Sequence, residues 1–260
     1  MDFLFAATAV LYALCAATSF AYLAGVSDKA ALWSRRLLPL AFLVHTAEIG
    51  ARGVAGLHPV SSVREAVGFA AWLLVGVFLL AQLRRRLDAV IAFVVPAALV
   101  LMVAARMTPV GDTGISGLGV LGRIHISLAA VGLAIFALAT AVAVLYLLGE
   151  RQLKRKRIGG MVRRGTALDT LDRLAHRCVQ LGFPIFTVSI ICGAVWSARL
   201  GAGFRPEYAI AAVAWAAFAA LLVARVTAGW RGRRAALLTI VGFAAALAVM
   251  GAYLLRAALD

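Results

Sequence analysis

The chain alternates between long apolar runs and short polar connections. Each run approaches the roughly 20 apolar residues that a helix needs to cross a bilayer. Backbone polar groups in lipid must be satisfied within the segment itself, and no strand-like alternation favours a barrel. The pattern therefore predicts an all-α polytopic membrane protein. The eight predicted spans cover residues 3–25, 37–55, 65–83, 89–107, 123–148, 179–199, 206–224 and 235–255.

The composition supports this interpretation over a large soluble core. Apolar residues make up 64% of the 260 residues and charged residues 14%, whereas soluble domains are about half apolar and about a quarter charged. The excess runs along the whole length, so residues 1–260 are expected to form one transmembrane domain.

The basic residues are distributed unevenly between the two sides of the predicted membrane. Nineteen of the 26 lysines and arginines fall in the connections 26–36, 84–88, 149–178 and 225–234, and seven fall on the opposite side. Positively charged connections remain in the cytoplasm, so both termini are expected outside. The net charge of +15 is then a consequence of topology, and no nucleic-acid partner is expected.

The longest connection, 149–178, contains the basic run RQLKRKR. Anionic membrane lipid is its expected partner. Within it, Leu168, Leu171 and Leu174 form an apolar stripe at i, i+3 and i+6, which predicts a short amphipathic helix over 167–177 on the cytoplasmic face.

The second span contains polar residues that lipid should exclude. His45, Glu48 and Arg52 recur at i, i+3 and i+7 and therefore share one helix face. Glu48 and Arg52, four residues apart, are expected to form an ion pair. His45, near mid-membrane, has no local partner, and an ionisable residue at that depth is a functional candidate. A neutral histidine bonded to a neighbouring helix is the structural alternative.

Two further histidines lie on the predicted outer half. His125 begins the fifth span beside Arg123, and His58 lies in an outer connection. Three of the four histidines on one side indicate a ligand site for a metal centre or haem, with His125 and His45 as the metal ligands. The three cysteines form no C-x-x-C-H motif, so the chain is not itself a c-type cytochrome. Hydrolase, zincin and P-loop signatures are also absent from the sequence.

Six motifs in order resemble the cytochrome c assembly membrane proteins of the CcsA/HemX type. His45 precedes an outer connection and helix similar to that family's H-P-x5-E pattern, and Ile124-His125-Ile126 is similar to its I-H-V. The stretches that carry the resemblance are HPVSSVREAVGFAAW (His58–Trp72), IHI, YLLGERQLKRK, ALDTLDRL, GFPIFTVSIICGAVW (Gly182–Trp196) and GWRGRRAALLTIVGF (Gly229–Phe243).

This resemblance implies a protein of the bacterial inner membrane that handles haem for cytochrome c. It implies non-covalent b-type haem as cofactor, and apocytochrome c or a second assembly subunit as partner. His125 is the expected outer axial ligand, and His45 a ligand or relay. The residues expected around the porphyrin and its propionates are Trp196, Phe204, Trp215, Arg123, Arg52 and His58.

The sequence departs from the family at its tryptophan-rich motif. Where W-D-P-K-E is expected, the chain has Phe204-Arg205-Pro206-Glu207-Tyr208, and a later family histidine is replaced by Val223. The chain is therefore more similar to the shorter HemX-like branch, and its part in haem attachment is expected to be accessory rather than enzymatic.

Two other functions remain open from the sequence. One is a HemX-type interaction protein that affects tetrapyrrole synthesis through the connection 149–178 without haem chemistry. The other is a small secondary transporter using Glu48 and Arg52, although the histidine–glutamate–arginine stripe has no counterpart in the other half of the chain.

Overall fold

The computed structural model describes residues 2–84, 87–108, 119–156, 166–201 and 203–259. Within these residues all regular structure is helical, and each helix is long and apolar enough to cross a membrane. The predicted all-α fold with eight spans is confirmed. The helices are α1 (Asp2–Ala24), α2 (Lys29–Val54), α3 (Val63–Gln82), α4 (Asp88–Met107), α5 (Gly119–Lys154), α7 (Leu168–Arg199), α8 (Pro206–Thr227) and α9 (Arg233–Leu259).

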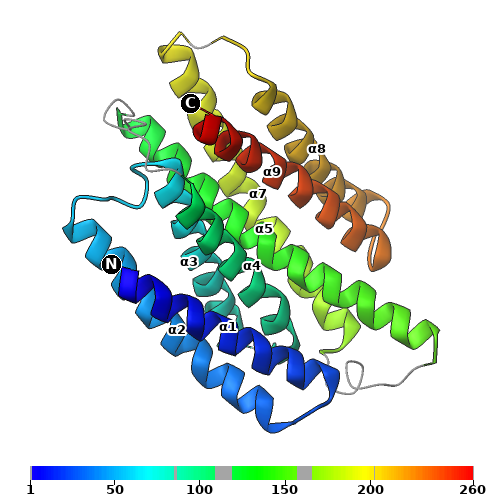
Figure 1. The fold of residues 1–260 in the computed structure, drawn as a ribbon. Coiled ribbons are helices and arrows are strands. Elements are labelled where there is room, and N and C mark those ends of the chain that lie inside the picture. Colours follow the sequence, from blue (N-terminus) through cyan, green and yellow to red (C-terminus); the bar gives the residue numbers. More distant parts are fainter. Residues whose placement is uncertain (1, 85–86, 109–118, 157–165, 202, 260) are drawn as a thin grey trace.

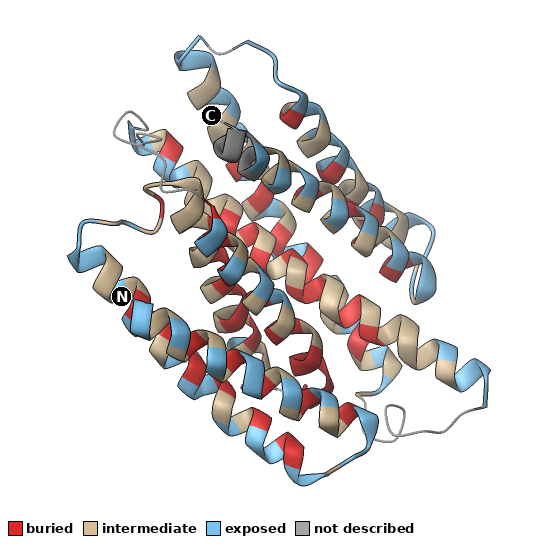
Figure 2. Ribbon diagram, viewed as in Figure 1, coloured by how far each residue is buried: buried red, intermediate tan, exposed pale blue. Residues whose placement is uncertain are grey.

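The helices pack as a series of neighbouring hairpins (Figure 1). α1 packs on α2 and α4, and α3 packs on α4 and α5. α5 packs most extensively on α7 and also contacts α9, which pairs with α8. The buried residues are densest along α4 and the middle of α5 (Figure 2), so these two helices form the centre of the molecule.

The longest helices extend beyond their predicted spans. The amphipathic segment 167–177 was predicted as a separate helix, but its residues from Leu168 onward are the first turns of α7. No helix-breaking residue separates them from the span, and Leu171 and Cys178 are both buried along the same face. The basic residues 157–165 of the predicted loop lie outside the described residues.

Local sequence signals fix where some helices begin. α3 begins after Ser62, whose Oγ accepts a hydrogen bond from the Glu65 backbone N–H at 3.2 Å. Ser62 and Glu65 have the S-x-x-E spacing of a capping box, which satisfies N–H groups that the first helical turn leaves without partners. α8 begins at Pro206, a position where the missing N–H of proline costs nothing.

Interhelical hydrogen bonds from tryptophan hold α3 to α2. The Trp72 Nε1–H donates to Thr46 Oγ1 at 2.8 Å, and its ring stacks on Phe42 with centroids 5.1 Å apart.

We expect Trp72→Phe to keep the stacking and to lower the free energy of unfolding by about 0.6 kcal/mol, the usual value of such a bond in a membrane protein. Thermal unfolding in detergent measures this. Trp33→Phe, at a site 55% exposed, is the control expected to change nothing, and equal effects of the two variants would contradict the assignment.

Candidate functional site

His125 lies in the first turns of α5 and is held by α7. Its Nδ1 lies 2.7 Å from the backbone oxygen of Ser189, and the Ser189 hydroxyl donates to the His125 backbone oxygen at 3.0 Å. A carbonyl oxygen only accepts, so Nδ1 carries the proton and Nε2 keeps its lone pair. The described residues place no hydrogen-bond partner on Nε2. This is the tautomer in which a histidine binds a metal through Nε2.

His125 lines a cavity of about 310 Å³ between α3, α5, α7, α8 and α9, here called the apolar cavity. Its walls are mostly alanine and larger aliphatic or aromatic side chains. The lining side chains that can form hydrogen bonds are those of Ser62, His125, Ser189 and Trp196. Its volume is within the range of small-molecule sites. The arrangement suits an apolar ligand with a few polar contacts.

Trp196 is the second notable side chain of the apolar cavity. Its ring centroid lies 6.4 Å from that of His125, and its indole Nε1 is buried without a hydrogen-bond partner among the described residues. A buried donor without a partner is costly, so a ligand with an acceptor group would satisfy it.

Close packing of α7 positions the imidazole. A Cβ built on Gly193 would lie 2.7 Å from both Cε1 and Nδ1 of His125. A glycine is therefore required at this point of α7. The sequence interpretation missed Gly193 and Ser189, although both lie in the stretch GFPIFTVSIICGAVW that carries the resemblance.

The other aromatic and outer residues of the predicted site lie elsewhere. Trp215 donates to Thr187 Oγ1 at 3.0 Å and packs on Phe183, outside the cavity lining. Phe204 is 81% exposed, and Arg123 and His58 are exposed. Of the eight predicted residues, the structure brings only His125 and Trp196 together here.

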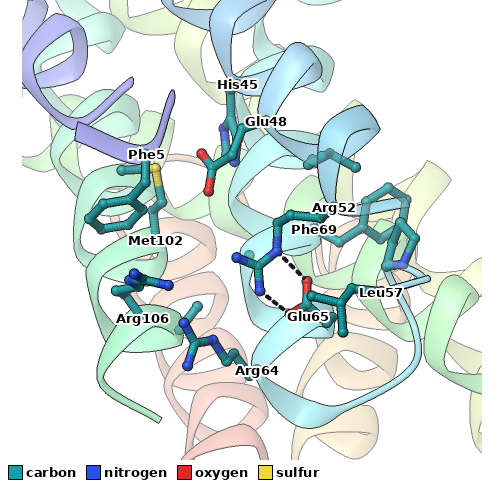
Figure 3. Close-up of a pocket in the computed structure, with 14 residues that line it drawn as sticks. Phe5, His45, Glu48, Arg52, Leu57, Arg64, Glu65, Phe69, Met102 and Arg106 are labelled. Carbon is teal, nitrogen blue, oxygen red and sulfur yellow. Dashed lines mark hydrogen bonds and ion pairs between the residues drawn. The ribbon is translucent and has the colours of Figure 1, made fainter. Parts of the chain in front are cut away.

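His45 lines a different, smaller pocket between the ends of α1, α2, α3 and α4, here called the polar cleft (Figure 3). It is 2% exposed, and its Nδ1 lies 3.0 Å from the hydroxyl of Tyr12 on α1. The sequence interpretation found no local partner because the partner lies on another helix. No lining residue is shared with the apolar cavity, so the two predicted metal ligands are not brought together.

The expected ion pair between Glu48 and Arg52 is wrong. Arg52 instead forms a bidentate pair with Glu65 on α3, with its Nε 2.8 Å from Oε2 (Figure 3). Both side chains are largely buried, at 13% and 9% exposed, and a two-pronged interaction outweighs the single contact available at i, i+4. Glu48 is 6% exposed, and its Oε2 has no hydrogen-bond partner among the described residues.

The fold and the two pockets define a polytopic helical membrane protein with a histidine-containing apolar cavity near one end of the bundle. Comparison with known families gives the particular class. The family described as Cytochrome C assembly protein matches residues 60–258, and the chain belongs to it. The polar cleft residues on α1 and α2 precede the matched range.

The similar curated proteins are cytochrome c biogenesis proteins CcsA. The chain is 44% identical to the Gloeobacter violaceus protein over 88 residues, 33% of this chain and 26% of that protein. It is 46% identical to the Synechococcus elongatus protein over 78 residues, 29% and 24% of the two chains. These matches span about a quarter of each relative. A third, from Gloeothece citriformis, is 28% identical over 258 residues, 78% of this chain and 79% of the relative.

Proposed function

We propose that this chain holds haem in the apolar cavity as part of cytochrome c assembly, with His125 Nε2 as the iron ligand. The observation that carries the proposal is the hydrogen bond from Nδ1–H to the Ser189 carbonyl at 2.7 Å. It orients the ring and leaves Nε2 as the free donor atom, as in metal-ligating histidines whose second nitrogen is bound.

The remaining residues fit such a ligand. The apolar walls contributed by residues such as Phe186, Ala129 and Val249 exclude water from a porphyrin face. The unpartnered Trp196 Nε1–H supplies a donor for a carboxylate. When bound, haem would supply an iron centre and two carboxylates, and the chain's part is to bind, orient and shield it.

His45 has no role as a ligand in this proposal. Its Nδ1 contacts Tyr12, and the polar cleft beside it has a volume of about 40 Å³, against about 310 Å³ for the apolar cavity. As a member of the cytochrome c assembly family, the chain is proposed to pass its haem to apocytochrome c or to a second assembly subunit. The loop-mediated alternative depends on the connection 149–178, of which residues 157–165 lie outside the described residues.

Absorption spectroscopy of the purified protein, as isolated and after haem reconstitution, tests the function. We expect a Soret band in the wild type and its loss or displacement in His125→Ala. The matched control is His58→Ala, which removes an exposed histidine and is expected to leave the band unchanged. Wild-type protein that remains haem-free after reconstitution, or an unchanged spectrum in His125→Ala, would overturn the proposal.

A further inference from the structure

The described helices form two four-helix units that pack in the same way. In the first unit α1 packs on α2 and α4, and α3 packs on α4. In the second unit α5 packs on α7 and α9, and α8 packs on α9. Helices α1, α2, α3 and α4 thus correspond in order to α5, α7, α8 and α9. Corresponding helices point in the same direction through the bundle (Figure 1).

The tryptophan contacts repeat between the units. Trp72 of α3 donates to Thr46 of α2 at 2.8 Å, and Trp215 of α8 donates to Thr187 of α7 at 3.0 Å. In each unit the tryptophan ring also packs on the phenylalanine four residues before that threonine.

An edge-to-face ring pair repeats as well. Tyr12 of α1 meets His45 of α2 at 5.7 Å and 78°. Phe136 of α5 meets Phe186 of α7 at 5.5 Å and 79°. His45 and Phe186 each precede the threonine of their unit by one residue.

The buried positions follow the same register. When the threonines and tryptophans are aligned, many buried residues of α2 and α3 fall opposite buried residues of α7 and α8, and α4 can be aligned with α9 in the same manner. The matched buried pairs include Leu38 and Val179, Ala41 and Gly182, Glu48 and Ser189, Ala71 and Ala214, Ile91 and Ala235, and Met102 and Ala246.

This register superposes the linings of the two pockets. On α2 and α7 it pairs Glu48 with Ser189 and Ile49 with Ile190, and every one of these residues lines its own pocket. On the last helix of each unit it pairs Ala105 with Val249 and Arg106 with Met250. The first residue of each pair lines the polar cleft and the second lines the apolar cavity. The two pockets therefore share several matched lining positions, although the apolar cavity is also lined by α3 of the first unit.

We propose that the polar cleft is a second ligand site and that its ligand is water carrying an exchangeable proton, bound at the carboxyl group of Glu48. Glu48 is more than nine-tenths buried, its Oε2 has no hydrogen-bond partner among the described residues, and the residue lines the cleft. Figure 3 shows this carboxyl group facing the space that Arg52, Arg64 and Arg106 approach from α2, α3 and α4. A volume of about 40 Å³ accommodates on the order of three waters.

The groups that face Glu48 favour this ligand over an ion. Arg52 is paired with Glu65, and Arg106 with Asp2 of α1. Arg64 donates to the Thr108 carbonyl at 3.2 Å. Three guanidinium groups disfavour a metal cation, and the carboxylates of Glu48, Glu65 and Asp2 already balance their charge, so a free anion is not required.

From α1 the neighbours are Thr8 and Tyr12, and Tyr12 is bonded to His45. These neutral groups add no charge beside the carboxyl. Water satisfies the unpartnered oxygen of Glu48 without adding charge.

Infrared difference spectroscopy of the reconstituted protein during a pH titration tests the proposal. We expect a carbonyl-stretch band of a protonated carboxyl that changes with pH and shifts in heavy water. The band should be lost in Glu48→Gln, retained at a displaced frequency in Glu48→Asp, and unchanged in Glu150→Gln, whose carboxylate pairs with Lys154 instead. It should also persist in His125→Ala, because this site does not depend on haem.

The Glu48→Asp variant covers the case in which Glu48→Gln does not fold, because it keeps a carboxyl group in the cleft. In this variant the band should move to a new frequency, whereas a band from any other carboxyl group would keep its wild-type frequency. The proposal is overturned if the infrared band survives in folded Glu48→Gln, if the wild type shows no such band, or if the band of Glu48→Asp keeps the wild-type frequency.

Discussion

Arg225→Met is expected to lower the free energy of unfolding by about 3–5 kcal/mol, because it leaves a buried carboxylate without its cation. Arg225 of α8 donates to both oxygens of Asp172 on α7, at 3.2 and 2.6 Å. The two side chains are 10% and 11% exposed. The Gly232 backbone N–H adds a third hydrogen bond to Asp172 at 2.9 Å. This one carboxylate therefore fastens α7, α8 and the turn before α9.

Chemical or thermal unfolding in detergent measures the loss, and the same helix offers a control. Arg173 pairs with Asp169 on the surface of α7, where the side chains are 48% and 70% exposed. Arg173→Met is expected to cost no more than about 0.5 kcal/mol. The double variant Asp172→Leu with Arg225→Met should recover most of the stability, because no buried charge remains. Equal losses in Arg225→Met and Arg173→Met would contradict the assignment.

Gly193→Ala is expected to weaken haem binding at least tenfold, about 1.4 kcal/mol, while leaving the fold intact. The added Cβ would approach the His125 ring to 2.7 Å, so the imidazole must rotate and lose its bond to the Ser189 carbonyl. The ring would then present Nε2 in a different direction.

Haem titration of the purified variants, followed by absorption, measures this effect. Gly50→Ala is the matched control, because a Cβ at Gly50 meets nothing within 4 Å. Binding by Gly193→Ala with wild-type affinity and an unchanged spectrum would show that the position of the His125 ring does not govern the site.

The sequence predicted the number and type of the helices but not the partners of the buried polar groups. Hydropathy is a local property, and each span is apparent from about 20 consecutive residues. The partners of Arg52 and His45 are Glu65 and Tyr12, which lie on neighbouring helices. Only the packing of the bundle selects them, so spacing along α2 could not.

Residue identity also conceals the internal repetition. Matched positions such as Glu48 and Ser189, or Arg106 and Met250, differ in charge and polarity. What the units share is burial, side-chain direction and a few contacts such as those of Trp72 and Trp215. The second unit has no histidine–glutamate–arginine stripe because the two units retain shared packing and not shared chemistry.

The parallel orientation of the two units places both pockets at the same end of the bundle. His125 and Trp196 lie near the start of α5 and the end of α7, and Glu48 and Arg106 lie near the ends of α2 and α4. Units of opposite orientation would have placed the pockets at opposite ends. A partner protein docked at this end of the bundle would therefore contact both pockets at once.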